Sequence, residues 1–287
     1  MPSSPDYLVI GHVTKDLYPG GYKIGGTVTF SALTVRNLGY KAGIVTCSGP
    51  DLDLGQLPAD LDILAHRSEQ STAFENIYNG GHRRQFIRSR ARQLICSDVP
   101  DAWMRVPIVH LGPLAQEIDV EIADCFPQAL LGLTPQGWMR NWDQDGRVFP
   151  VQWNPPQALL QRADVVILSH EDVGGDMDLV HEFARQTRLL VMTTGWQGAT
   201  VYYQGKRRSF SAPRVNEQDP TGAGDIFAAA FLTTFYHTQD PWLSTQFANC
   251  VAAHSVERSG VSSIPTRQEI ARCRSLFPAL AGQEVPK

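Results

Sequence analysis

Short apolar runs alternate with segments of helical periodicity from the start of the chain. Residues 7–10 form an apolar run that ends in Gly11, which predicts a buried strand. Residues 27–38 carry apolar side chains at roughly helical spacing, and Gly39 follows as a stop signal. Residues 42–46 again read as a strand. Strand, turn, helix and strand within the first 46 residues indicate an α/β layer.

The same rhythm returns in the second half of the chain. Strands are predicted at 106–111, 128–133, 164–168 and 189–193, a strand pair at 199–203 and 207–212, and helices at 179–186, 225–236, 243–258 and 266–276. Thr266 with Glu269 three residues later forms a capping box for the last helix. We therefore expect an α/β fold, with one doubly wound, mostly parallel sheet flanked by helices, as a single domain over residues 1–287. Ligands of such sheets bind beyond the carboxyl ends of the strands.

Residues 72–88 interrupt this rhythm. Side chains alternate on both sides of Asn79-Gly80-Gly81, which is typical of a β-hairpin. The hairpin either covers a binding site as a small lid or is a surface hairpin without a role.

Composition narrows the functional classes. The chain has 287 residues, 43% of them hydrophobic, and this is ordinary for a globular protein. A net charge of -4 argues against a protein that binds nucleic acid through bulk positive charge. No stretch of about 20 apolar residues predicts a membrane span, and residues 1–6 do not resemble a signal peptide.

The cysteines indicate a reducing environment. Five cysteines are far apart in the sequence, with no C-x-x-C motif and no Cys/His cluster, so the sequence predicts no structural zinc. An odd number without close spacings fits a reducing compartment, and we expect a cytoplasmic protein.

The strongest chemical signal is the segment 219–225 (Asp-Pro-Thr-Gly-Ala-Gly-Asp), which leads directly into an apolar helix. Amides of Gly222, Ala223 and Gly224 would be unpaired at the positive end of the helix dipole and could bind phosphate. Asp225 would repel a phosphate, but its carboxylate could accept the proton of a hydroxyl group that attacks the phosphate. The alternative is that Asp225 only stabilises the helix dipole.

This segment resembles the signature of the ribokinase-like (PfkB) carbohydrate kinases, and the resemblance covers about residues 7 to 270. It implies that Asp225 is the catalytic base and that the amides of Gly222, Ala223 and Gly224 form an anion hole. It also implies ATP and Mg²⁺ as cofactors, and residues 72–88 as the lid. Whether a monovalent cation assists stays open.

Acceptor-binding residues follow from the same resemblance. Asp16 follows the first strand, and its carboxylate could accept hydrogen bonds from vicinal hydroxyls; the alternative is a loop residue that caps a turn. Gly25 and Gly26 resemble the diglycine of the family, where the lid meets the domain. Phe30 stands where many members have an Asn, which puts a ribose-like or fructose-like substrate in doubt. The local pattern is closer to an inositol kinase-like branch.

Two further segments follow predicted strands. Gln136 and Arg140 could contact substrate, with Arg140 bringing positive charge to the transferred phosphate; alternatively, Arg140 is a surface residue. Residues 169–172 (Ser-His-Glu-Asp) stand where the family has Asn-x-x-Glu. There Asp172, or Glu171 instead, would help to hold Mg²⁺ through water.

Residues 193–198 (Thr-Thr-Gly-Trp-Gln-Gly) resemble the nucleotide turn of the family, so Thr193, Gly195 and Gly198 are expected at the nucleotide. Asn249 matches a residue that lines the adenine pocket in relatives, although a helical Asn can also face solvent.

The sequence therefore predicts a kinase that phosphorylates a hydroxyl group of a small sugar, polyol or nucleoside. A non-catalytic sensor on a kinase scaffold is the alternative, motivated by the departures at Phe30, Ser169 and Asp172. We expect no nucleic-acid or membrane partner, and either a monomer or a homodimer formed through the lids.

Overall fold

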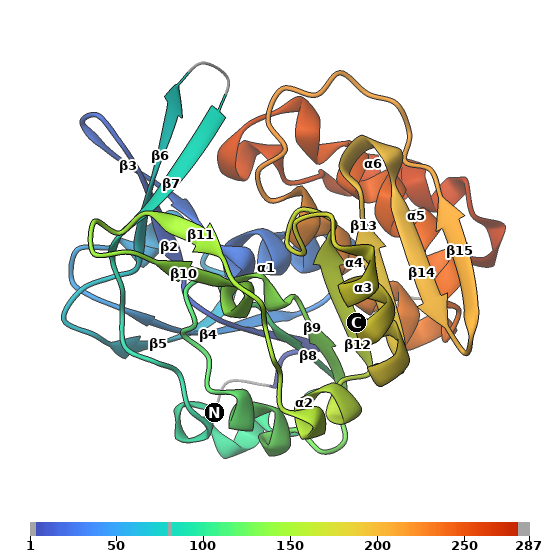
Figure 1. The fold of residues 1–287 in the computed structure, drawn as a ribbon, viewed down its shortest axis with the longest axis horizontal. Helices are drawn as coiled ribbons and strands as arrows, with labels where there is room; N and C mark the ends of the chain where they lie inside the picture. The colour runs from blue at the N-terminus through green and yellow to red at the C-terminus, as the bar shows by residue number, and fades with distance from the viewer. Residues whose placement is uncertain (1–3, 80–81, 281–287) are drawn as a thin grey trace.

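A nine-stranded sheet forms the centre of the computed structural model, which describes residues 4–79 and 82–280 (Figure 1). The strand order is β15-β14-β13-β12-β9-β8-β1-β4-β5. The strands from β13 to β5 pair in parallel, whereas β14 and β15 are antiparallel. Their bounds are β1 (Tyr7–Ile10), β4 (Ala42–Ser48), β5 (Asp62–Arg67), β8 (Ile108–Leu111), β9 (Leu130–Leu133), β12 (Val165–Ser169), β13 (Leu189–Thr193), β14 (Ala199–Tyr203) and β15 (Lys206–Phe210). The predicted mostly parallel α/β sheet is confirmed.

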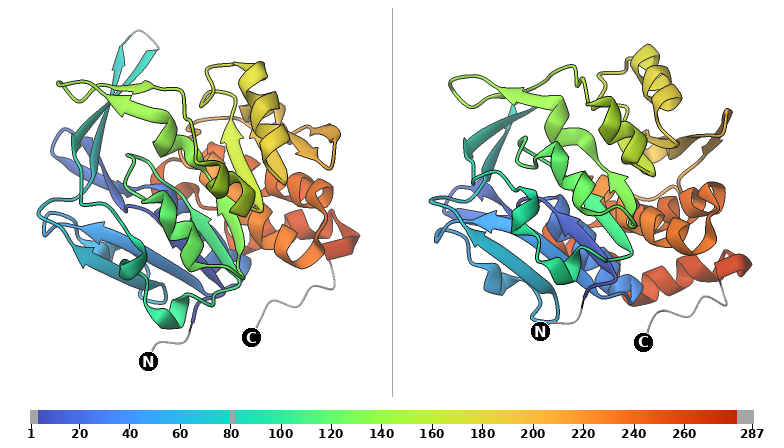
Figure 2. Two further views of the ribbon diagram at one scale, coloured as in Figure 1. Left: turned by 60° about the horizontal axis from the view of Figure 1, so that its bottom comes forward. Right: turned by 90° about the horizontal axis from the view of Figure 1, so that it is seen from below.

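Helices cover both faces of the sheet, which explains why its strands are apolar on both sides. Helices α1, α4, α5 and α6 contribute to one core, and α2 and α3 contribute to the other. Figure 2 shows helices on both sides of the sheet. The helices are α1 (Thr27–Leu38), α2 (Gln157–Arg162), α3 (Met177–Gln186), α4 (Ala223–Thr238), α5 (Pro241–Ala253) and α6 (Arg267–Ser275). Among the described residues, no helix is long and apolar enough to cross a bilayer.

The strand order reverses beside β1. From β1 the chain first builds β4 and β5 on one side and later adds β8 and β9 on the other. At such a switch point the connections leave the carboxyl ends of neighbouring strands in opposite directions, and a crevice opens between them. The fold therefore directs the segments after β1 and β8 toward a binding site.

A second sheet stands apart from the first (Figure 1). It has four strands in the order β3-β2-β6-β7. The strands are β2 (Thr14–Tyr18), β3 (Gly21–Gly25), β6 (Ala73–Asn79) and β7 (His82–Ser89). The predicted strands of the 72–88 hairpin are confirmed, although Gly80 and Gly81 lie outside the described residues. The alternative interpretation of Asp16, a loop residue that caps a turn, was wrong, because Asp16 lies in β2 and pairs with Lys23 of β3.

Several helix ends differ from the prediction, and two of them lie near the Gly222 turn or after α5. Helix α4 begins at Ala223, two residues earlier than expected. Helix α5 ends at Ala253 and not near residue 258. There Ser255 Oγ donates a hydrogen bond of 2.7 Å to the carbonyl of Ala252, and a hydroxyl that bonds the preceding backbone favours a helix end. The capping box of Thr266 and Glu269 is confirmed at α6.

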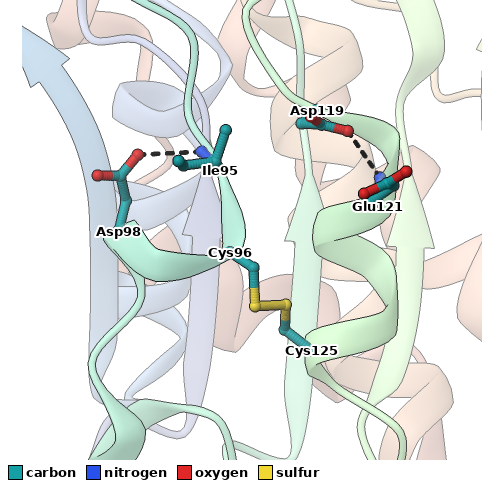
Figure 3. Close-up of a disulfide and its surroundings, with 6 residues drawn as sticks. All are labelled: Ile95, Cys96, Asp98, Asp119, Glu121 and Cys125. Atoms are coloured by element: carbon teal, nitrogen blue, oxygen red, sulfur yellow. Dashed lines mark hydrogen bonds between the residues drawn. A yellow bond between two sulfur atoms is a disulfide. The ribbon is translucent and has the colours of Figure 1, made fainter.

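Four of the five cysteines are paired in the structure. Cys96 and Cys125 form a disulfide between two 3₁₀ segments (Figure 3). Cys250 and Cys273 form another between α5 and α6, and Cys47 is free and buried. The sequence spacing did not indicate either pair, because each joins segments that only the folded chain brings together.

Candidate active site

The turn before α4 forms the floor of the candidate site. Gly222 is the N-cap residue with φ of 82°, a conformation that glycine adopts without strain. In the described part of the chain, the amides of Gly222 and Gly224 donate to no acceptor, whereas the Ala223 amide donates to the Pro220 carbonyl at 3.1 Å. The expectation of three consecutive open amides was therefore wrong at Ala223. Two open amides at a helix N-terminus still suit an anion.

Asp225 lies in the first turn of α4 with an intermediate solvent exposure. Burial of the carboxyl group raises its pKa to about 6, against the lowering effects of a hydrogen bond from Thr27 and of the Arg140 charge. The charge of Asp172 is a smaller contribution to this raised value. A carboxyl group with this pKa is mostly ionised at pH 7 but binds a proton more readily than an ordinary aspartate. It is suited to general base chemistry.

Phe30 packs directly beneath the Gly222 turn. Its side chain is 2% exposed, and a methyl group added to Gly222 would collide with its ring. The residue that departs from the expected Asn thus supports the anion-binding turn from the core side.

This contact leads to a prediction on stability. We expect Gly222→Ala to destabilise the fold by about 2 kcal/mol or more, since it adds both left-handed strain and overpacking. Gly224→Ala is the matched control, because a methyl group there meets nothing within 4 Å. Thermal denaturation should show a melting temperature several degrees lower for Gly222→Ala only. Equal melting temperatures would contradict the role of the Phe30 contact.

Asp16 and the diglycine meet at the base of the second sheet. The carboxylate of Asp16 lies over Gly25, where a methyl group would collide with it. Gly26 is the N-cap of α1 with φ of 96°, and the next residue, Thr27, bonds Asp225. Asp16 is therefore linked to Asp225 through its contact with Gly25, the chain from Gly25 to Thr27 and the hydrogen bond of Thr27.

Gln136 and Arg140 lie after β9, on the expected side of the sheet. Gln136 Nε2 donates to Asp172 Oδ1 at 3.0 Å, so Gln136 orients an acid of the site. Arg140 Nη1 donates to Gln85 Oε1 of β7 at 3.3 Å, and its charge acts on Asp225. Arg140 thus connects the second sheet to the candidate base.

Asp172 is the candidate magnesium residue. Its Oδ2 accepts from the Ser169 amide at 2.8 Å, and Ser169 Oγ accepts from the Asp172 amide at 3.0 Å. Both carboxylate oxygens thus accept one hydrogen bond each and retain lone pairs. This arrangement fits a hydrated Mg²⁺, which usually keeps several waters. The alternative acid, Glu171, is exposed.

A pocket of about 430 Å³ opens beside the Gly222 turn. All four residues predicted to bind nucleotide line it, together with two from the turn: Thr193, Gly195, Gly198, Asn249, Ala223 and Gly224. Gly198 has φ of 99°, and a methyl group there would collide with the Phe210 carbonyl. Asn249 is 4% exposed and donates to the same carbonyl at 3.0 Å, which excludes the interpretation that it faces solvent.

Sequence reasoning missed the apolar wall of this pocket. It is built by side chains from the loop after β15 and from α4, α5 and the segment that follows α5: Ala212, Val215, Phe227, Ala252, Ala253 and Val256. Trp196, which is 67% exposed, stands among the lining residues. No motif marks these residues, since small apolar side chains in a loop and on a helix read as ordinary core.

The comparisons with known proteins agree with the fold. Residues 158–267, which include the Gly222 turn and every residue that lines the pocket, match the pfkB family carbohydrate kinase model. The cytidine kinase of Thermococcus kodakarensis is 25% identical over 254 residues, covering 80% of this chain and 88% of that protein. An Escherichia coli fructokinase is 26% identical over 306 residues, covering 91% of this chain and 97% of that protein.

Solved structures match over nearly the whole chain. A pyrophosphate-dependent kinase of the ribokinase family superposes with a TM-score of 0.78 at 24% identity, covering 92% of this chain and 99% of that one. The ribokinase of Thermotoga maritima gives a TM-score of 0.72 at 20% identity, covering 93% and 98%. Residues 158–267 therefore resemble a PfkB carbohydrate kinase domain, and the fold of the chain is that of the ribokinase family.

Proposed function

We propose that this protein transfers the terminal phosphoryl group of ATP to a hydroxyl group of a small sugar, polyol or nucleoside. The observation that carries the proposal is the position of Asp225, whose carboxyl pKa is about 6, in the same turn as the open amides of Gly222 and Gly224, where Gly224 lines a pocket. The named activities of the relatives, fructokinase and cytidine kinase, support an acceptor of this class.

In the proposed reaction, Asp16 and the Gly25-Gly26 backbone hold the acceptor. Asp225 accepts the hydroxyl proton as the new bond to phosphorus forms, and the amides of Gly222 and Gly224 stabilise charge on the phosphoryl oxygens. Arg140 adds positive charge near the same place. The protein contributes mainly positioning and electrostatics, as is usual for phosphoryl transfer.

Mg²⁺ fits this proposal at Asp172, through water. When bound, it would neutralise charge on the phosphate oxygens. The hydrogen bond from Gln136 would hold the Asp172 carboxylate in a fixed orientation. The second sheet, with the 72–88 hairpin, is proposed as the lid that excludes water. We leave a homodimer through this sheet as an alternative to a monomer.

The composition of the pocket favours ATP over pyrophosphate as the donor. A related structure is a pyrophosphate-dependent kinase, which makes pyrophosphate the rival donor. Pyrophosphate has no apolar surface, whereas the pocket presents Val215, Ala253 and Val256 beyond the anion-binding turn. An apolar wall stabilises a nucleobase, because burial of its ring removes apolar area from water.

The donor prediction is tested with initial rates on a panel of sugars, polyols and nucleosides, each with ATP and with pyrophosphate. We expect turnover with ATP only. Ala253→Trp should fill the pocket and raise the KM for ATP about tenfold or more, since it removes roughly 1.4 kcal/mol of base binding. Glu182→Trp, at an exposed position on α3, controls for the added indole. Turnover with pyrophosphate alone would reject the proposed donor, and binding without turnover for every acceptor would favour the sensor.

A further inference from the structure

Two cysteines and a histidine converge at the ends of α5 and α6. Cys250 lies on α5, His254 caps the same helix, and Cys273 lies on α6. One ligand atom of each residue lies within 4.8 Å of the other two. The sequence predicted no Cys/His cluster because Cys250 and Cys273 are 23 residues apart. The folded chain overturns that expectation.

The backbone presents these side chains without relying on the bond between the sulfur atoms. Residues four apart lie on one face of a helix, and His254 keeps helical torsions with φ of -68° and ψ of -21°. Arg258 donates two hydrogen bonds of 3.0 Å to the carboxylate of Glu269. That ion pair joins the segment after α5 to the first turn of α6. This contact links the two helices independently of the disulfide.

The two cysteines are buried, whereas the histidine is partly exposed to solvent. Cys250 and Cys273 are 6% and 0% exposed, so the two sulfur atoms are shielded from solvent. The side chain of His254 is 28% exposed, and its Nδ1 lies 3.9 Å from Glu257 Oε2. Glu257 is therefore a charged neighbour of the imidazole, at a distance longer than a hydrogen bond. The exposed side of His254 gives access from solvent.

The donor set selects the ion. Thiolates are soft ligands, and imidazole is a borderline ligand. A set of two thiolates and one imidazole therefore suits Zn²⁺. Three protein ligands leave the fourth tetrahedral position to water. Hard ions such as Mg²⁺ prefer oxygen ligands and would not compete well.

We propose that the reduced protein binds one Zn²⁺ ion through Cys250, His254 and Cys273. A dithiol reductant supplies two electrons and two protons, the bond between the sulfur atoms breaks, and the reductant becomes a disulfide. Zinc then displaces both thiol protons, which pass to solvent. The disulfide-bonded form and the zinc-bound form exclude each other. This inference does not rest on the proposed kinase activity.

The test is a zinc titration of the reduced full-length protein, in competition with a chromophoric chelator. We expect one Zn²⁺ per chain for the reduced wild type and none at this site after oxidation. Substitution with Co²⁺ should give thiolate-to-metal charge-transfer absorption. Cys250→Ser and Cys273→Ser should each lose tight binding. Cys47→Ser and Cys96→Ser are matched controls that should retain it.

His254→Gln guards against misfolding of the cysteine variants, because it leaves both cysteines and their disulfide in place. We expect zinc to raise the melting temperature of the reduced wild type, since a ligand that binds only the folded state stabilises it. The same shift should be absent or much smaller in His254→Gln. The proposal is overturned if the reduced wild type binds no zinc, or if the three site variants bind it as tightly as the wild type.

Discussion

Asp225→Asn is expected to lower the turnover number by about 10²–10⁴, the usual contribution of a general base. The amide keeps the shape of the side chain but cannot accept the hydroxyl proton. ATP should still bind, because the pocket and the amides of Gly222 and Gly224 are unchanged. Steady-state rates at saturating ATP and acceptor, with ATP affinity from calorimetry, measure both quantities.

Asp240→Asn is the matched control for this substitution. Asp240 is the N-cap of α5 and accepts hydrogen bonds from the Trp242 and Leu243 amides at 2.8 and 3.1 Å. Asn is as good an N-cap as Asp, so both stability and turnover should persist. If Asp225 only stabilised the dipole of α4, its loss would cost ~0.3–1 kcal/mol of stability and leave turnover intact. Wild-type turnover in Asp225→Asn would therefore remove the residue from its catalytic role.

The pH dependence of the rate gives an independent readout of the same residue. The pKa of Asp225 is raised to about 6, and the base must be ionised to accept a proton. We expect kcat/KM to be level above that pH and to fall roughly tenfold per pH unit below it. Asp225→Asn should lose this acidic limb. If the kcat/KM of the wild type fell only near pH 4, burial would not be what sets the pKa of Asp225.

The local patterns in the sequence were sufficient for most of the central sheet. Apolar runs such as Tyr7–Ile10 and Leu189–Thr193 are strands in the structure, because burial on both faces leaves an unbroken apolar run. The turn before α4 was also identifiable, since its glycines and carboxylates lie within seven consecutive residues. Features that depend on neighbouring residues are therefore predictable from one sequence.

The β2–β3 pair was missed although a signal for it exists. The strands are short and carry Lys15, Asp16 and Lys23, so no apolar pattern marks them. The turn between them, Pro19-Gly20, has φ of 94° at Gly20. Pro followed by Gly is the signature of a type II turn. Reading it as a hairpin would have placed Asp16 on a strand.

Contacts between distant segments could not be obtained from the pattern. Gln136 and Asp172 are 36 residues apart, yet they share a hydrogen bond. The apolar wall of the pocket combines Val215 with Val256, and neither position has a distinctive local signal. Such contacts depend on how the sheet and helices pack, and packing is a property of the whole chain.

The acceptor side of the site is tested by Asp16. Its carboxylate lies over Gly25 on the second sheet. The hydroxyl groups of a substrate that enters there would donate hydrogen bonds to the carboxylate oxygens. Asp16→Asn removes the charge and one of these oxygens. Loss of a charge-assisted hydrogen bond costs about 1.5–3 kcal/mol, and we expect the KM for the acceptor to rise about 10- to 100-fold. The KM for ATP should stay constant, because Asp16 is not among the lining residues of the proposed nucleotide pocket at α4 and α5.

Glu75→Gln is the matched control for Asp16→Asn. Glu75 lies on β6 of the same sheet and pairs with Arg88 at 2.7 Å, with both side chains well exposed. An exposed ion pair contributes little to stability, so this variant should keep both KM values. An equal rise of the acceptor KM in both variants would show that the charge of the second sheet matters and not the position of Asp16. An unchanged acceptor KM in Asp16→Asn would place the acceptor elsewhere, while leaving the assignment of Asp225 to its own test.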